Sequence, residues 1–195
     1  MTTSPVTPHL HAADEPELVR SPTIRYAAVL GSGAPGSDEF YRKKLLVADV
    51  ARALAAGGAD PAVEIQYWYP EGSAHVEIAD FYSINPVPSL EYRVLAAIPD
   101  DTAAEELAAA RERAASTSDA AGDAVELFMI PAQDVVQVMH HGPFADEFAT
   151  LAKLGAFAAA RGLHRHGPHH EVHLDAFRRD TPQGSLRTIL RDPVA

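Results

Sequence analysis

The sequence contains no cysteine, and its apolar runs are short. The first absence excludes a disulfide framework and a thiolate metal site. The second argues against a membrane-spanning helix, because such a helix needs roughly 20 apolar residues. The N-terminus also lacks a basic segment followed by an apolar core, which is the signature of a signal peptide. We therefore expect a cytoplasmic protein without a membrane partner.

Basic residues are scarce as well: 16 Lys and Arg stand against 27 Asp and Glu, which gives a formal net charge of −11. Contacts to phosphates require clustered Lys and Arg, so this balance argues against a nucleic-acid partner. Apolar residues make up 47% of the 195-residue chain, which is enough to form a hydrophobic core.

The N-terminal residues 1–22 are rich in Ser, Thr, Pro and His and show little periodicity. This composition predicts a flexible N-terminal arm, followed by a folded domain over residues 23–195.

The glycines of Gly31-Ser32-Gly33-Ala34-Pro35-Gly36 match the spacing of a dinucleotide-binding loop. Such a loop also needs an acidic residue at the end of a second parallel strand, and none is evident. The favoured interpretation is therefore a connection between a strand and a helix, and we expect no cofactor.

Hydrophobic periodicity divides the remaining chain into strands and helices. Helical spacing occurs over residues 39–56, 103–115 and 145–160, and strand patterns occur over residues 24–30, 63–69, 90–98, 124–131, 134–140, 169–174 and 186–190. Residues 75–84 predict a weak strand or an irregular segment.

The order strand–helix–strand–strand recurs in two pseudo-repeats, residues 23–115 and 123–195, with a small polar linker at residues 116–122. The short connections between strands, including a turn at residues 132–133, suggest hairpins. The sequence thus predicts an α+β fold, in which a curved antiparallel sheet carries helices on one face and leaves the other face open for a concave pocket.

Glu171 is the most conspicuous polar residue of a predicted strand. Because the strand alternates, Glu171 and His173 point to one face and Val172 to the other. If Val172 faces the helices, Glu171 faces the open side of the sheet. A half-buried carboxylate is costly unless it has a partner or a function. Glu171 could therefore pair with Arg187 or Arg191 across the closing hairpin, or it could contact a ligand.

Histidines surround Glu171, and His169 and His173 share its predicted face. Histidine-rich tracts can bind a metal ion, and these three residues form a plausible ligand set.

Several stretches of the chain carry a family resemblance when they are taken together. They are GSGAP at residues 31–35, YRV at 92–94, VQVMHHGPFADE at 136–147, HHEVHL at 169–174, RR at 178–179 and LRTILRDPV at 186–194. From about residue 22 to residue 194, the chain resembles GyrI-like proteins, also called the bacterial effector-binding or multidrug-sensor ligand domain.

The resemblance implies duplicated β-α-β-β units with a ligand cleft between the halves and Glu171 in that cleft. The chain is most similar to stand-alone members without a DNA-binding domain. Some of these look like hydrolases of cyclopropane-bearing DNA alkylators of the yatakemycin and duocarmycin kind, and hold the drug in an aromatic cage. Two positions depart from the family, which usually has Tyr in place of His173 and often in place of Phe144. The resemblance accounts for His169 and His141 without a metal, so no metal site is expected.

Aromatic side chains are the expected walls of the ligand site. Trp68, Tyr69 and Tyr82 flank the loop after the second predicted strand and are the first candidates. The other expected ligand-binding residues are Phe144, His141, His173 and Phe177. Such walls suit a planar polycyclic ligand, because stacking adds about 0.5–1.5 kcal/mol per aromatic pair beyond area burial.

Two functions are consistent with these residues. As a hydrolase, the protein would open the activated cyclopropane of a planar natural product and so protect the cell. Glu171 would deprotonate a water, and Tyr69, Tyr82 or His173 would donate a hydrogen bond to the carbonyl that becomes a phenolate. As a binding protein, it would sequester a hydrophobic, often cationic, compound, with Glu171 as the counter-charge.

Both functions imply a planar hydrophobic small molecule as the partner and a monomer or homodimer as the active form. A protein-partner role such as gyrase inhibition is a weaker third option, since no residue pattern demands it.

Overall fold

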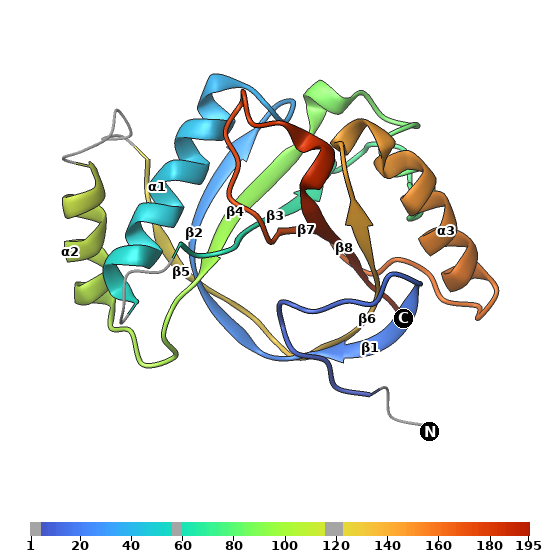
Figure 1. Ribbon diagram of the computed structural model, residues 1–195, viewed down its shortest axis with the longest axis horizontal. Coiled ribbons are helices and arrows are strands. Elements are labelled where there is room, and N and C mark those ends of the chain that lie inside the picture. The colour runs from blue at the N-terminus through green and yellow to red at the C-terminus, as the bar shows by residue number, and fades with distance from the viewer. Residues whose placement is uncertain (1–4, 56–59, 116–122) are drawn as a thin grey trace.

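The computed structural model describes residues 5–55, 60–115 and 123–195, which form a curled sheet with helices packed on it (Figure 1). The strands of this part of the chain are β1 (Glu17–Ser21), β2 (Ile24–Ser32), β3 (Val63–Trp68), β4 (Glu91–Ala97), β5 (Glu126–Ile130), β6 (Gln133–His141), β7 (His169–His173) and β8 (Arg187–Pro193). The helices are α1 (Asp38–Leu54), α2 (Ala104–Ala115) and α3 (Glu147–Ala159). The predicted linker at residues 116–122 lies outside the described residues.

The sheet confirms the predicted α+β class and is antiparallel throughout, in the order β1-β6-β8-β7-β3-β4-β2-β5. Strands β5 and β6 are almost continuous in the chain, yet β5 pairs with β2 and β6 pairs with β1 and β8. The short connection between them is therefore a bend and not a hairpin, which corrects the expectation for residues 132–133. Bent long strands of this kind let the sheet curl into a half-barrel (Figure 1).

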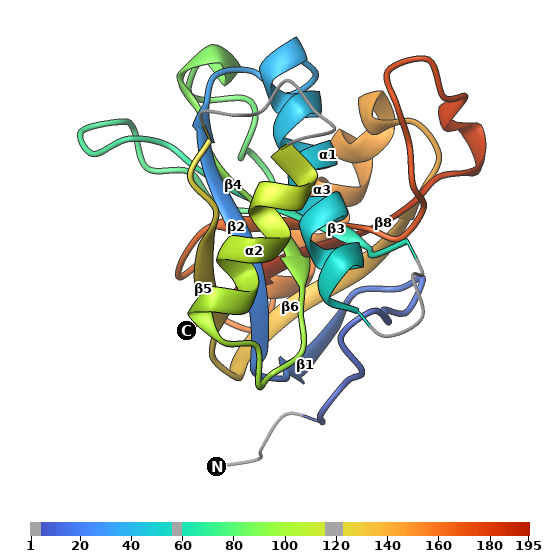
Figure 2. The same ribbon diagram turned by 90° about the vertical axis from the view of Figure 1, so that its left-hand side faces the viewer.

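Helix α1 starts where the sequence predicts. The Ser37 side chain caps it by accepting a hydrogen bond from Phe40 N at 3.1 Å. The buried side of α1 packs on β2, β3 and β4, and α2 packs against α1 (Figure 2). Helix α3 covers a second apolar cluster on β6 and β8, to which it contributes Leu151 and Leu154.

Strand β7 directs Glu171 toward these helices. Its partners in register are Ile65 on β3 and Leu190 on β8. Ile65 belongs to the core under α1 and Leu190 to the core under α3. Directly opposed residues share a face of the sheet, so Glu171 points to the helical face and Val172 to the other. The expectation that Glu171 lies on a face free of helices is wrong.

The face opposite the helices is covered by residues 5–16, which we call the N-terminal strap. Ala12 of the strap is buried against Val172 and Ile189. Residues 5–22, predicted as most of a flexible arm, thus pack on the sheet and include β1. The composition of residues 5–16 does not predict this packing, because the strap is held by a few small apolar side chains and by backbone hydrogen bonds.

A buried polar cluster lies beneath the N-terminal strap. Glu64 accepts a hydrogen bond from Tyr26 Oη at 3.1 Å and contacts the imidazole of His9 in the strap. Arg191 donates from Nε to Gln137 Oε1 at 2.8 Å and from Nη2 to the His9 carbonyl oxygen at 2.8 Å. Both Glu64 and Arg191 are almost fully buried. The charges on this face are therefore satisfied within the fold.

Candidate functional site

A pocket of about 360 Å³ lies on the helical face, between α1 and α3 and over β7. Its size is within the range of small-molecule sites. Half of its lining side chains are aromatic. The pocket is lined by Pro35, Gly36, Phe40, Tyr41, Tyr67, Tyr82, Val87, Phe144, Glu147, Phe148, Glu171, His173, Phe177 and Gln183.

Glu171 is the carboxylate at the base of this pocket, and it is 6% exposed. Tyr82 Oη donates a hydrogen bond to Oε1 at 2.6 Å, and His173 Nε2 lies 3.1 Å from Oε2. His169 Nε2 lies 4.0 Å from Oε1. Neither predicted arginine pairs with Glu171, because Arg187 binds Asp175 and Arg191 belongs to the opposite face.

The surroundings of Glu171 keep it ionised. Burial alone would raise the pKa of its carboxyl, but the hydrogen bond from His173 and the nearby imidazoles and Tyr82 hydroxyl lower it below the ordinary value. Burial lowers the pKa of His173, so this ring is neutral near pH 7. A carboxylate only accepts hydrogen bonds, so the ring proton of His173 lies on Nε2. Its Nδ1 is buried without a hydrogen-bond partner among the described residues.

Glu147 is a second buried carboxyl in the same pocket, and it is 5% exposed. Burial, with the neighbouring charge of Glu171, raises the pKa of Glu147 to about 10. Its Oε1 has no hydrogen-bond partner within the described part of the chain. Near neutral pH, Glu147 therefore holds a proton that it can donate, while Glu171 can accept one. Two carboxyls whose pKa values are pushed apart are a typical acid–base pair.

This assignment predicts how a Glu147→Gln variant responds to pH. The pKa of Glu147 is higher in the folded state than in the unfolded state, so its contribution to stability is present at low pH and is lost as pH rises toward 10. Gln does not titrate. Between pH 5 and pH 8, the variant should therefore gain roughly 1–3 kcal/mol in free energy of unfolding relative to the unsubstituted protein. Urea denaturation of both proteins at pH 5 and at pH 8 measures this gain. The prediction is contradicted if the difference in free energy of unfolding between the two proteins is the same at both pH values.

Tyr82 reaches Glu171 from the irregular segment that follows β3. This segment passes directly over α3, where a Cβ on Gly155 would lie 2.8 Å from Ala79 N. Only glycine permits this approach. Ile78 and Phe81 of the same segment are fully buried, and Phe81 packs against the Tyr82 ring at a centroid distance of 4.8 Å. The Tyr82 hydroxyl is thus held in place by packing on both sides.

The structure brings five of the sequence-predicted residues together in the pocket: Glu171, Tyr82, Phe144, His173 and Phe177. The Phe177 ring stacks near those of Phe144 and His173, at centroid distances of 4.9 and 5.0 Å. These three rings form one continuous wall.

Three other predicted residues lie outside the pocket lining. Tyr69 donates to the Asn85 carbonyl oxygen at 3.4 Å, and Trp68 Nε1 donates to Glu91 at 2.6 Å. His141 is exposed, and its Nε2 lies 2.8 Å from Asp14. The alternation of β3 explains why Trp68 is outside the lining, since Tyr67 and not Trp68 shares a face with Glu171.

The sequence interpretation missed Glu147 and gave no special role to Tyr67. Glu147 was visible as the last residue of the VQVMHHGPFADE stretch, but a glutamate at a helix start is usually read as a favourable charge for the helix dipole. Tyr67 could have been found if β3 had been paired with β7, because the register then places Tyr67 on the same face as Glu171.

Residues 5–55, 60–115 and 123–195 contain neither a cluster of metal ligands nor a membrane-spanning helix. No group of three or more His, Cys, Asp or Glu side chains is arranged to hold a metal ion there. His169, for example, is instead bound to Asp192 at 3.0 Å. No helix of these residues is both long and apolar enough to cross a bilayer.

Solved structures share this fold over nearly the whole chain. An uncharacterized conserved protein from Listeria innocua is 25% identical, with a TM-score of 0.74 over 94% of this chain and 93% of that one. A hydrolase from Listeria innocua is 23% identical, with a TM-score of 0.74 over 95% and 94% of the two chains. The protein SAV2435, bound to tetraphenylphosphonium, is 11% identical, with a TM-score of 0.51 over 93% and 94%.

A family model covers more than half of the sequence. The model of the GyrI-like small molecule binding domain matches residues 81–194, which include Tyr82, Glu147, Glu171 and His173. No curated protein matches the chain. The half-barrel, the pocket between α1 and α3 and this match agree, and the chain belongs to the family of GyrI-like small molecule binding domains.

Proposed function

We propose that the pocket hydrolyses the activated cyclopropane of a planar DNA-alkylating natural product of the yatakemycin or duocarmycin type. One observation carries the proposal: two buried carboxyls, Glu171 and Glu147, line a pocket with aromatic walls and are held in opposite protonation states. Hydrolytic opening of the ring requires one group that accepts a proton from water and another that supplies a proton to the carbonyl oxygen as it becomes a phenolate.

Glu171 acts as the general base. It takes a proton from a water molecule, whose oxygen attacks the unsubstituted carbon of the cyclopropane. A carbon–carbon bond of the ring breaks, and its electron pair moves into the conjugated carbonyl, which becomes a phenolate. Tyr82 and His173 hold Glu171 in place through their hydrogen bonds. This role replaces the direct contact with the substrate carbonyl that was expected of Tyr82.

Glu147 then supplies the proton to the phenolate oxygen. Its protonated carboxyl faces the pocket and has an oxygen without a partner among the described residues. Tyr67 is a second donor for the same oxygen, because its hydroxyl has no hydrogen bond to the described residues and burial raises its pKa. The charges of Glu171 and Glu147 both act on Tyr67, so it lies close to both carboxyls.

The aromatic walls suit a flat ligand. Phe144 and Phe177 line one side, and Tyr41 lies beyond Phe177 at a centroid distance of 6.3 Å. A planar ring system held between such walls gains dispersion and stacking energy without any polar contact. His173, which stands where the family usually has Tyr, holds Glu171 and so keeps a polar role at this position.

Mass spectrometry tests the proposal directly. Purified protein incubated with yatakemycin is expected to convert the drug to a species heavier by one water, faster than buffer alone. Glu171→Gln should not do so, whereas Asp134→Asn, a change of a half-exposed carboxylate at the start of β6, should retain full turnover. An unchanged drug mass after long incubation with the unsubstituted protein would overturn the proposal.

Binding without turnover is the second candidate function. It is favoured by the ionised state of Glu171, because a buried carboxylate inside an aromatic pocket is a counter-charge for a hydrophobic cation. SAV2435, which shares the fold, was solved with tetraphenylphosphonium bound. Saturable binding of this cation by calorimetry, together with an unchanged drug in the mass experiment, would favour this function over hydrolysis.

A further inference from the structure

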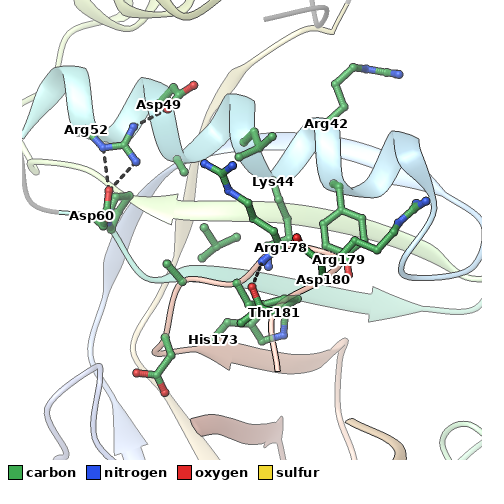
Figure 3. Close-up of a pocket in the computed structure, with 18 of the residues that line it drawn as sticks. Arg42, Lys44, Asp49, Arg52, Asp60, His173, Arg178, Arg179, Asp180 and Thr181 are labelled. Carbon is green, nitrogen blue, oxygen red and sulfur yellow. Dashed lines mark hydrogen bonds and ion pairs between the residues drawn. The ribbon is translucent and has the colours of Figure 1, made fainter. Parts of the chain in front are cut away.

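A second, larger cavity of about 1000 Å³ lies next to the ligand pocket, between α1 and the loop that connects β7 to β8 (Figure 3). The two cavities share Tyr41, His173 and Phe177. The second cavity differs in its chemistry, because charged side chains from α1 and from the loop face each other across it (Figure 3). Lys44 on α1 differs from the other charged side chains because it is buried.

Lys44 is buried and has no ion-pair partner in the part of the chain that the structure describes. It is 6% exposed, and its Nζ lies 3.2 Å from the centroid of the Phe177 ring. No carboxylate of the described residues lies within ion-pair distance of Lys44, whereas the neighbouring Lys43 binds Asp123 at 2.7 Å and Glu39 at 3.3 Å. An amine with an open cavity beside it and no acid partner is free to react.

Four of the five acids that line the second cavity are bound to arginines. Arg52 holds Asp49 and Asp60. Arg179 holds Asp38. Asp175 is held by Arg187. The exposed Asp180 is the one lining carboxylate without an ion pair among the described residues. The cavity therefore does not supply a close counter-charge to Lys44.

The groups that face Lys44 act on its charge in opposite directions. Burial lowers the pKa of Lys44 to about 7, and the charge of Glu171 on β7 partly opposes this. His173, also on β7, is neutral near pH 7, and Arg178 and Arg179 of the loop add positive charge at the cavity wall. The face of the Phe177 ring, next to Nζ, favours the ammonium form. Burial therefore leaves Lys44 easier to deprotonate than an amine in water.

We propose that Lys44 is a nucleophilic amine that captures aldehydes in the second cavity as imines. A neutral lysine amine in a desolvated site is the form that attacks carbonyl carbons. Its nitrogen forms a bond to the aldehyde carbon, the carbonyl oxygen leaves as water with the two protons of the amine, and a carbon–nitrogen double bond remains. No oxidant or metal is required. This reaction is independent of the proposed hydrolysis, since the aldehyde enters the second cavity and not the ligand pocket.

Labelling with pyridoxal 5′-phosphate tests the proposal, because the chain offers only three lysines, Lys43, Lys44 and Lys153. The full chain is incubated with the aldehyde at pH 7, reduced with cyanoborohydride and digested with trypsin, which does not cleave after a modified lysine. We expect Lys44 to be labelled at least about tenfold faster than Lys153, because Lys44 lies in a desolvated cavity and Lys153 is exposed to water. The preference for Lys44 should shrink as the pH is raised, because high pH favours the neutral, nucleophilic form of any amine.

Two matched variants complete the experiment. Lys44→Arg should lose the fast label and keep the slow one at Lys153, and Lys43→Arg should keep both. Circular dichroism confirms that each variant is folded. Equal labelling of Lys44 and Lys153 at pH 7, or loss of the fast label in Lys43→Arg, would overturn the proposal. Because the readout is a mass added to a peptide, its failure is distinct from a failure of drug hydrolysis.

Discussion

The Glu171→Gln variant is expected to lose at least about 100-fold in kcat/KM for cyclopropane hydrolysis, the usual scale for removal of a general base. Gln has nearly the same size as Glu but cannot take a proton from water. It also brings an amide between Tyr82 Oη and His173 Nε2, both of which now donate to a carboxylate. Steady-state kinetics with yatakemycin measure the loss.

The same variant separates the two candidate functions through its affinity for tetraphenylphosphonium. Removing the counter-charge should weaken binding of this cation by at least about tenfold if Glu171 faces it across the pocket. Calorimetric titration measures the change. Tyr82→Phe should have a smaller effect in both assays, because it removes one hydrogen bond and leaves the charge.

Asp134→Asn is the control for both assays, since Asp134 is half-exposed, lies outside the pocket lining and pairs with Arg20 at the start of β6. It should change neither kcat/KM nor the affinity by more than about twofold. Wild-type turnover and wild-type affinity in Glu171→Gln, with loss of neither, would exclude any role of this carboxylate in the pocket.

Local patterns in the sequence were sufficient for most of the helices and strands and for the face that Glu171 shares with His173. The helix that begins after Ser37 and the alternation around Glu171 are both properties of short stretches, and both are confirmed. Helix capping and strand alternation depend on neighbours a few residues away, so they can be read without a fold. Alternation also placed Glu171 and His173 on one face, as observed.

Long-range pairing was not predictable in the same way. The face of the sheet to which Glu171 points depends on which strands flank β7, and this follows from the pairing of Ile65 and Leu190 with it. The sequence of residues 169–174 alone does not determine to which face of the sheet Glu171 points. The bend between β5 and β6 is similar, because a two-residue connection serves a hairpin or a bent strand equally well.

The pocket walls were harder still to predict. Tyr69, Trp68 and Tyr82 are near one another in the sequence, but only Tyr82 lines the pocket. Tyr82 reaches it because its segment lies against α3 at Gly155, a contact between parts of the chain more than 70 residues apart. Glu147 became recognisable as a proton donor only once its burial beside Glu171 was known. A pKa shift arises from burial and from nearby charges, and the residues responsible can be far apart in the sequence.

The opposite face of the sheet predicts the largest effect on stability. Arg191→Met should lower the free energy of unfolding by roughly 3–5 kcal/mol, the range for breaking a buried charged network. The substitution leaves Gln137 Oε1 and the His9 carbonyl oxygen without their donor. It also removes a positive charge that lowers the pKa of the buried Glu64. Urea denaturation measures the loss.

Arg187→Met is the matched control on the same strand. Arg187 is exposed and holds Asp175, so water can replace it, and stability should change little. The two arginines are four residues apart on β8 and therefore point to the same side of the strand. A difference between them then reports burial under the N-terminal strap and not strand position. Equal stability of the two variants would show that the polar cluster around Glu64 and Arg191 is dispensable. In that case, the N-terminal strap would hold the sheet through its apolar contacts and backbone hydrogen bonds alone.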